Sequence, residues 1–332
     1  MNKNIKTPIT EYDVVFISYD EPNADENWYH LQSVCPWAKR SHGVYGSDAA
    51  HKAAANLSET ARFITIDADN QVLPGFFDID IDEIRLNELD VVSWAGRNTI
   101  NGLCYGNGGI KLWPVNVVQS MRSHEHDDAR DKRSQVDFCW NVNYVQMNNV
   151  YSDVINNTSP YQAFRAGFRE GSKMSLLDGD IITPFDHTLI HPVNYRRLLI
   201  WMSVGSDVSN GLWAVYGARL GFYMTNFERE SWTWQNIRDF HWHNAFWDQE
   251  IKHQFVDEAH GTVCASTGYS WSFEKLHKET SRLGDKIRTL IPEMNLVDLN
   301  TTQSKFFKSV WTPPSRLKDA LVREEDVIKG IE

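Results

Sequence analysis

The sequence predicts an α/β protein in which a mostly parallel sheet is flanked by helices and followed by a helical, aromatic-rich C-terminal region. Two apolar runs, at residues 13–19 and 63–67, have the length and composition of buried strands. An alanine-rich segment at residues 48–61 favours a helix between them. Because a strand, a helix and a second strand in this order are typical of a parallel sheet with covering helices, these segments predict the fold class.

The other elements of the N-terminal half follow in chain order. Residues 27–35 predict a short helix after the first strand, and residues 89–95 and 110–114 predict two more strands. Residues 123–134 carry a dense run of charges, which favours an exposed loop. Residues 138–150 are expected to be extended and partly buried.

The C-terminal half is predicted to be mainly helical. Ser159 and Pro160 are residue types that begin helices, because serine caps the first turn and proline needs no N–H partner there. We therefore expect a core of residues 1–180 and a helical extension of residues 181–332. The helices expected in this half lie at residues 159–177, 195–204, 211–220 and 232–259, with a charged helix after residue 315.

Composition excludes several classes of protein. The chain has 332 residues, of which 42% are hydrophobic and 23% charged, so it can build a sizeable core. No apolar run approaches the ~20 residues of a membrane span, and the N-terminus lacks the apolar core of a signal peptide. We therefore expect a cytoplasmic protein without a membrane partner.

Cysteine spacing and net charge narrow the classes further. The four cysteines are scattered and form no C-x-x-C pair, which argues against a zinc site or a disulfide framework. The net charge of -11 argues against a broad, non-specific nucleic-acid surface, although it leaves room for a local basic groove.

The second apolar run ends in two aspartates, Asp67 and Asp69. Successive strand side chains point to opposite faces, so a D-x-D pair at the end of a strand brings both carboxylates to the same side. Hard divalent cations bind such oxygens and keep open positions for water and substrate phosphates. The pair predicts a site for Mn²⁺ or Mg²⁺, with a turn-capping role as the alternative.

The first apolar run leads into a polar loop formed by Ser18, Tyr19, Asp20 and Glu21. Such a loop at the end of a strand can hold the base and ribose of a nucleotide, and an ordinary turn is the alternative. Lys52, in the alanine-rich helix, could approach a diphosphate as a point charge or remain a solvated helix lysine.

The order of these elements resembles a glycosyltransferase of the GT-A fold, over about residues 13–177. The resemblance rests on a first strand that leads into a polar loop, on the alanine-rich helix, and on a strand that ends in I-D-A-D. It implies a Rossmann-type sheet and a UDP-sugar donor held by the loop of residues 18–21. By the same resemblance, Asp67 contacts the ribose or the metal, and Asp69 binds the metal that bridges the diphosphate.

Short segments also resemble proteins of tailed phages that are described as glycosyltransferases. These segments are residues 18–23, 65–70, 105–112 and 164–170. Some phages of this kind add glucose or arabinose to 5-hydroxymethylcytosine in their DNA. The resemblance therefore implies a hexosyl- or pentosyltransferase with DNA as its acceptor, acting in the host cytoplasm.

The general base implied by the resemblance is Glu170. In inverting enzymes of the family, an acidic residue on a helix at this place deprotonates the acceptor hydroxyl. The usual E-D doublet is Glu170 followed by Gly171 here, so Asp178 and Asp207 stay open as alternatives. An ion pair between Glu170 and a neighbouring lysine is the structural alternative.

Acceptor binding and a third metal ligand are also expected from later residues. Many GT-A enzymes add a late histidine to the metal site, and His241, His243 and His260 are candidates. In a helix, His241 and His243 would not share a face. The residues expected to bind the acceptor are Trp94, Gly108, Gly109, Lys111, Arg165 and Arg169.

Other functions stay open at the level of sequence. The acceptor could be a protein or a glycan instead of DNA. A nucleotidyltransferase also uses D-x-D and Mg²⁺, although the chain lacks its glycine-rich, basic N-terminal signature. A carbohydrate-binding or structural phage protein is the non-enzymatic alternative, with some of the 13 tryptophans forming the binding surface.

Overall fold

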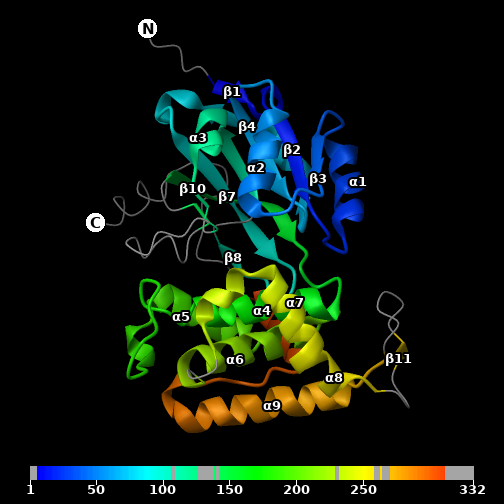
Figure 1. The fold of residues 1–332 in the computed structure, drawn as a ribbon, viewed down its shortest axis with the longest axis vertical. Coiled ribbons are helices and arrows are strands. Elements are labelled where there is room, and N and C mark those ends of the chain that lie inside the picture. The colour runs from blue at the N-terminus through cyan, green and yellow to red at the C-terminus, as the bar shows by residue number, and fades with distance from the viewer. Residues whose placement is uncertain are drawn as a thin grey trace. The chain divides into compact units, whose positions relative to one another are not determined.

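The computed structural model describes residues 6–105, 109–123, 125, 138–139, 142–228, 232–257, 262–263 and 270–310. Contacts divide the chain into two units (Figure 1). Unit 1 comprises Met1–Ala129, Asp137–Ile155 and Thr312–Glu332, and unit 2 comprises Arg130–Val136 and Asn156–Trp311. The functional boundary expected after residue 180 stays a prediction, because compactness does not test it.

Unit 1 is built on a mixed sheet with the strand order β3-β2-β4-β9-β7-β10-β5, in which β8 pairs with β7. β2 runs parallel to β3 and β4, and β10 runs parallel to β7. β9 runs antiparallel to both of its neighbours, because the connection from β7 is too short for a parallel crossover. The strands are β2 (Asp13–Ser18), β3 (Lys39–His42), β4 (Arg62–Asp67), β5 (Asn70–Val72), β7 (Asp90–Asn98), β8 (Cys104–Tyr105), β9 (Ile110–Pro114) and β10 (Asn143–Val154).

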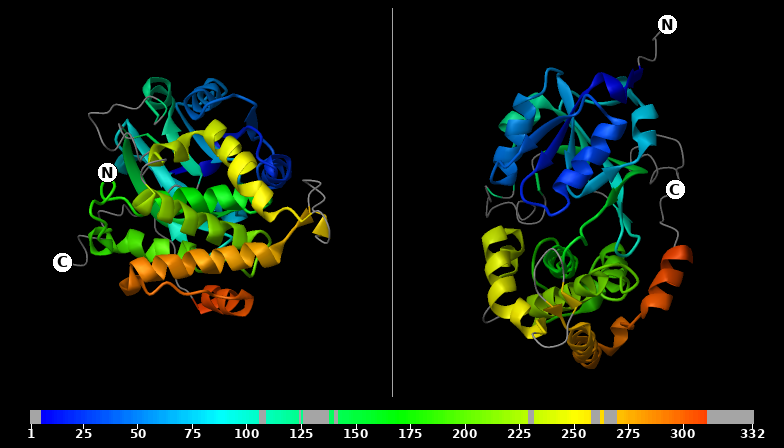
Figure 2. Two further views of the ribbon diagram at one scale, coloured as in Figure 1. Left: turned by 60° about the horizontal axis from the view of Figure 1, so that its bottom comes forward. Right: turned by 90° about the vertical axis from the view of Figure 1, so that its right-hand side faces the viewer.

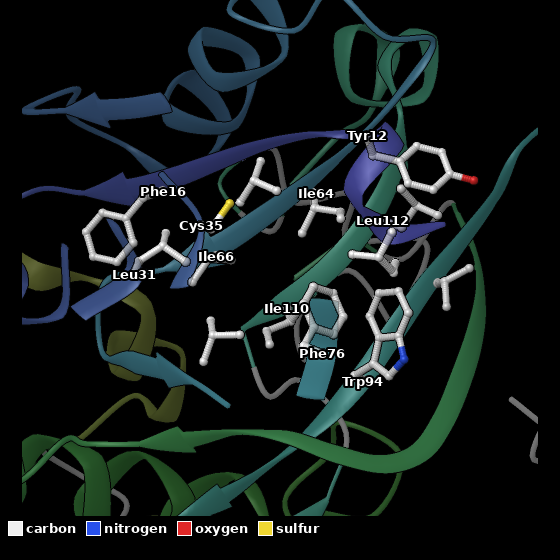
Figure 3. Packing of buried hydrophobic residues seen from close by; sticks show 14 of the residues in the cluster. Tyr12, Phe16, Leu31, Cys35, Ile64, Ile66, Phe76, Trp94, Ile110 and Leu112 are labelled. Carbon is white, nitrogen blue, oxygen red and sulfur yellow. The ribbon is translucent and has the colours of Figure 1, made fainter. Parts of the chain in front are cut away.

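Helices cover both faces of this sheet, which confirms the predicted α/β class. On one face, the α1 face, helix α1 (Ala24–Val34) packs on even-numbered side chains of β2 and β4 (Figure 3). On the other, the α2 face, helices α2 (Ser47–Asn56) and α3 (Val115–Ser120) pack on the odd-numbered ones. The two cores follow from the alternation of side chains along each strand.

The sheet is curled. Only Ala68 and Asp69 separate β4 from β5, yet β5 pairs with β10 at the far end of the strand order. One turn is enough to carry the chain from β4 to the side of β10, because the curl of the sheet brings these two strands close together. A small separate sheet pairs β1 (Lys6–Pro8) with β6 (Asp80–Asp82).

Short 3-10 helices complete unit 1. They are η1 (Ile9–Glu11), η2 (Pro74–Asp78) and η3 (Glu83–Arg85). Phe76 of η2 and Ile9 of η1 are fully buried in the core of the α1 face. These turns therefore close the part of that face that α1 leaves open.

Unit 2 is helical and rich in aromatic residues, as the sequence predicts. Helices α4, α6 and α9 lie side by side (Figures 1 and 2). Rings of α4, α6, α7 and the segments next to α7 pack together, and among them Phe168 contacts Trp232 and Trp242, and Trp213 contacts Trp247. The helices are α4 (Pro160–Lys173), α5 (Pro192–Trp201), α6 (Gly211–Phe227), α7 (Phe240–Phe246), α8 (Lys252–Phe255), α9 (Phe273–Leu290) and α10 (Thr301–Val310).

Smaller elements join the helices of unit 2. They are η6 (His187–Leu189), η7 (Trp234–Arg238), the π-helix η8 (Trp247–Ile251), η9 (Pro292–Met294), β11 (Thr262–Val263) and β12 (Ser270–Trp271). Across the described parts of the chain, no helix is both long enough and apolar enough to cross a membrane.

Most predicted elements are present, with shifted ends. Ser159 caps α4 as expected, because its side chain accepts a hydrogen bond from Gln162 N. The sequence did not predict β3 or α9. The helix expected after residue 315 and most of the charged loop at residues 123–134 lie outside the described residues.

Candidate functional site

The candidate site lies where β2 and β4 end. The chain leaves β2 through α1 to reach β3 on one side, and returns through α2 to β4 on the other side of β2. Ligands of α/β sheets bind outside the carboxyl ends of strands at such a change of direction. The loop of residues 18–21 follows β2, and Asp67 ends the neighbouring strand β4.

The backbone of the D-x-D turn is held from three directions. Asp67, Ala68 and Asp69 each make a backbone hydrogen bond to a different part of unit 1. The partners lie just before β9, in α1 and just after β10, and they hold both aspartates in place. The bonds are Asp67 N to Gly109 O (3.0 Å), Asn27 Nδ2 to Ala68 O (2.7 Å) and Ile155 N to Asp69 O (2.7 Å).

Asn70 fixes the side chain of Asp69. Its Nδ2 donates to Asp69 Oδ1 at 2.7 Å, and its Oδ1 accepts from the Ser152 hydroxyl at 2.8 Å. A Cβ at Gly109 would lie 2.2 Å from Asn70 Nδ2, and Gly109 has a φ of +78°. Gly109 therefore makes room for Asn70, and its expected role towards an acceptor stays a prediction. Gly108 lies outside the described residues.

Negative charge accumulates at this turn. Burial raises the pKa of Asp69 to about 7, and the charges of Asp67 and Glu21 act in the same direction. Burial also raises the pKa of Glu21, helped by Asp20 and Asp67, although Tyr19 N donates to its carboxylate at 2.8 Å. Glu21, Asp67 and Asp69, here called the carboxylate cluster, thus repel one another.

The carboxylate cluster fits an open site for a divalent cation. Within the described ranges, no three His, Cys, Asp or Glu side chains are placed to hold a metal ion by themselves. Mg²⁺ does not need such a cage, because it usually binds through one or two carboxylates plus substrate phosphates and water. Burial, and then repulsion by Asp67 and Glu21, raises the pKa of Asp69, and a cation bound by Asp67 and Asp69 would oppose both effects.

The loop after β2 divides into buried and exposed residues. Ser18 is buried, and its hydroxyl accepts from Arg40 Nε at 3.0 Å and contacts His42 Nδ1 at 2.9 Å. Asp20 is exposed. Tyr19 is 41% exposed, with its ring 5.9 Å from that of Tyr45. The exposed side chains of this loop are therefore open to a ligand, whereas the hydroxyl of Ser18 already has protein partners.

Lys52 has a protein partner as well. Its Nζ lies 2.6 Å from Asp48 Oδ2, four residues earlier on α2. The first N–H groups of that helix are also satisfied, because the Glu125 carboxylate accepts from Ser47 N at 2.6 Å and from Asp48 N at 3.2 Å. A diphosphate would have to displace these contacts to reach Lys52 or the end of α2.

Sequence reasoning missed His51, which lies in α2 on the α2 face. Its side chain is buried and its ring packs against Trp113 and Phe138. Burial lowers the pKa of His51, and the charges of Asp67 and Lys111 act on it in opposite directions. Its place in the predicted helix, one residue before Lys52, is the sequence feature that could have drawn attention to it.

Trp94 was expected to stack against an acceptor, but it is a core residue. Its side chain is 0% exposed on the α1 face, and its ring lies 5.1 Å from that of Phe76 (Figure 3). A fully buried ring offers no surface for stacking, so packing accounts for Trp94. The sequence could not distinguish the two roles, because both use a large aromatic residue on a strand.

Of the remaining predicted residues, Lys111 lies in β9 of unit 1, and the others that the structure describes belong to unit 2. Arg165 and Arg169 lie on α4, and Arg165 stacks over the ring of Phe240 at 3.8 Å. Glu170 lies on the same helix and is half-buried. Asp207 is buried and pairs with Lys308 at 2.6 Å, so as a general base it would first have to leave this ion pair.

The histidines of α7 point in different directions, as expected for a helix. His241 is exposed, whereas His243 is 1% exposed and makes a hydrogen bond of 3.1 Å to Ile237 O through Nε2. Burial, with the charges of Arg165 and Arg169, lowers the pKa of His243 to about 2. His243 is therefore neutral, and His260 lies outside the described residues.

Comparison with protein families, with curated proteins and with solved structures found no match for this chain. A functional conclusion therefore depends on the geometry and chemistry of the candidate site. Chain topology, hydrogen bonding and charge all favour the carboxylate cluster as the centre of that site.

Proposed function

We propose that this chain is a metal-dependent glycosyltransferase that moves a sugar from a nucleotide sugar, preferably a UDP-sugar, to a hydroxyl acceptor. The observation that carries the proposal is the fixed pair Asp67 and Asp69 at the change of direction between β2 and β4. A D-x-D pair held in this way is suited to a cation that also binds a diphosphate.

Each group has a role in this proposal. Mn²⁺ or Mg²⁺ held by Asp67 and Asp69 supplies a Lewis acid for the leaving diphosphate. The carboxylates of Asp20 and Glu21 accept hydrogen bonds from ribose hydroxyls, and the exposed ring of Tyr19 offers a surface to the base. If configuration inverts, we propose Glu170 as the general base that takes the proton of the acceptor hydroxyl.

For the acceptor, we propose 5-hydroxymethylcytosine in DNA. Support comes from Arg165 and Arg169, which lie one turn apart on α4, and from Phe240, against which Arg165 stacks. Cationic and aromatic side chains together bind phosphates and unstacked bases. The net charge of -11 opposes DNA binding, so the interaction would be local and sensitive to salt.

A donor screen tests the glycosyltransferase proposal. The protein is incubated with Mn²⁺ and a panel of nucleotide sugars, with nucleoside triphosphates as a second panel, and released nucleotide or pyrophosphate is measured. We expect nucleotide release from one sugar donor, loss of release in EDTA, and at least a 100-fold loss in Asp69→Ala. Asp78→Ala, which removes an exposed aspartate of η2, is the matched control. Unchanged turnover in Asp69→Ala would refute the metal-site assignment.

A carbohydrate-binding function is the second candidate, because unit 2 contains a pocket of about 480 Å³. Its lining combines aromatic and polar side chains, as sugar sites do. The lining residues are Gly179, Asp180, Ile181, Trp232, Thr233, Trp234 and Gln235. Binding of a free sugar without nucleotide or metal, lost in Asp180→Ala, would favour this function over transfer.

A further inference from the structure

Lys111 is a buried lysine on the α2 face of unit 1. It lies in β9, where Ile110 and Leu112 point into the core of the α1 face (Figure 3). Alternation along the strand therefore directs Lys111 to the α2 face. Lys111 is only 5% exposed, and in the register of the sheet it lies between Thr65 of β4 and Ser93 of β7.

Among the residues that the structure describes, the ammonium group of Lys111 makes no hydrogen bond and no ion pair. The hydroxyl of Ser93, opposite Lys111, is also buried without a hydrogen-bond partner. An ammonium that loses most of its surrounding water without gaining a partner costs free energy in the folded chain.

The charges around Lys111 show where its ammonium acts. In the register of the sheet, Lys111 lies opposite Thr65, two residues before Asp67 on β4, and the charges of Lys111 and Asp67 both act on His51. His51 is not a competing cation, because burial lowers its pKa and its Nδ1 lies 2.8 Å from Ser47 O. The other cations near the ends of β2 and β3 have partners, since Lys52 pairs with Asp48 and Arg40 pairs with Asp25.

We propose that Lys111 binds a phosphate of the nucleotide diphosphate, on the donor side of the site rather than the acceptor side. This assignment rests on the proposed function. The diphosphate would then meet positive charge from two sources, the cation held by Asp67 and Asp69 and the ammonium of Lys111. A largely buried lysine suits this role because a charge with little water around it is screened less and attracts a phosphate more strongly.

Calorimetric binding to the full chain tests the assignment, with Lys111→Met as the variant and Lys278→Met, at an exposed lysine of α9, as the matched control. The probes are UDP, uridine, inorganic pyrophosphate and Mn²⁺, each measured alone, with EDTA present for the first three. We expect Lys111→Met to bind UDP and pyrophosphate at least 10-fold more weakly, with uridine and Mn²⁺ unchanged. Its melting temperature should rise by a few degrees, because a well-packed apolar side chain replaces an unpaired charge.

The results that would contradict the Lys111 assignment differ from those that would contradict the proposed function. Equal affinity of Lys111→Met and the unaltered chain for pyrophosphate overturns the assignment, as does a loss confined to a DNA oligonucleotide, which would return Lys111 to the acceptor side. If Lys111→Met does not fold, Lys111→Gln and Lys111→Arg carry the same comparison, with binding retained in the arginine variant. Lys111-dependent pyrophosphate binding without any sugar transfer would refute the proposed function and leave the subsite standing.

Discussion

At the scale of single residues, the folded environment of Asp69 changes its titration. Burial and the neighbouring carboxylates raise its pKa to about 7, so it is protonated in weak acid and charged above neutrality. An unfolded aspartate loses its proton near its ordinary pKa of about 3.9. The folded chain therefore binds the extra proton between these values, and its stability falls as the pH rises through about 7.

The fall in stability with rising pH leads to a prediction about Asp69→Asn. In EDTA, the free energy of unfolding of the unaltered chain should fall by about 2 kcal/mol between pH 5 and pH 8, and Asp69→Asn should remove most of that dependence. Urea denaturation at both pH values measures the difference, with Asp78→Asn as control. A dependence that persists in Asp69→Asn would assign it to another group.

Gly109 gives a second prediction at this scale. Gly109→Ala places a methyl group against Asn70 and an L-residue at a φ of +78°, so we expect a loss of about 2–4 kcal/mol. Gly43→Ala has a similar φ with nothing within 4 Å and isolates the backbone cost, expected to be about 1 kcal/mol. Gly75→Ala has neither problem and should be near neutral. Equal losses in Gly109→Ala and Gly43→Ala would mean that Asn70 moves without cost.

At the scale of elements, periodicity predicted the strands and helices whose side-chain pattern is local. β2 and β4 are apolar along their length, and α4 begins at a serine cap followed by proline. β3 was missed because its sequence, K-R-S-H, is polar and lies at the edge of the sheet. α9 was missed although its buried residues, among them Leu276, Leu283 and Ile287, recur at helical spacing.

Close packing of α4 against α6 gives a prediction for an element. A Cβ at Gly171 would lie 2.0 Å from Ala218 O, and backbone cannot yield as a flexible side chain can. Gly171→Ala should therefore cost at least about 3 kcal/mol of unfolding free energy, although alanine is the better helix former. Ala166→Gly, on the same helix, should cost only about 1 kcal/mol. A neutral Gly171→Ala in denaturant titration would contradict this packing.

At the scale of the whole molecule, the net negative charge of the chain opposes the binding of any DNA acceptor. If the basic residues of α4 bind DNA, reversing Arg165 and Arg169 to glutamate should weaken binding at least 10-fold and reduce its salt dependence. Reversing Lys275 and Lys278, exposed residues of α9, changes the net charge equally and should have a smaller effect. Fluorescence anisotropy with a hydroxymethylcytosine oligonucleotide measures both. Equal effects of the two pairs would indicate non-specific attraction.

The sequence by itself determined the buried strands, the helix that joins them, and the placement of Asp67 and Asp69 at the end of one strand. These features follow from local patterns of apolar, capping and acidic residues. Tertiary structure decided what those patterns leave open. It set the curl that sends β5 to β10, the hydrogen bonds that join Asp67 to Gly109 and Asp69 to Ile155, and the burial of Trp94 and Lys111. Burial and pairing depend on residues far apart in the chain, and so only the folded molecule decides which side chains are buried and which polar groups they meet.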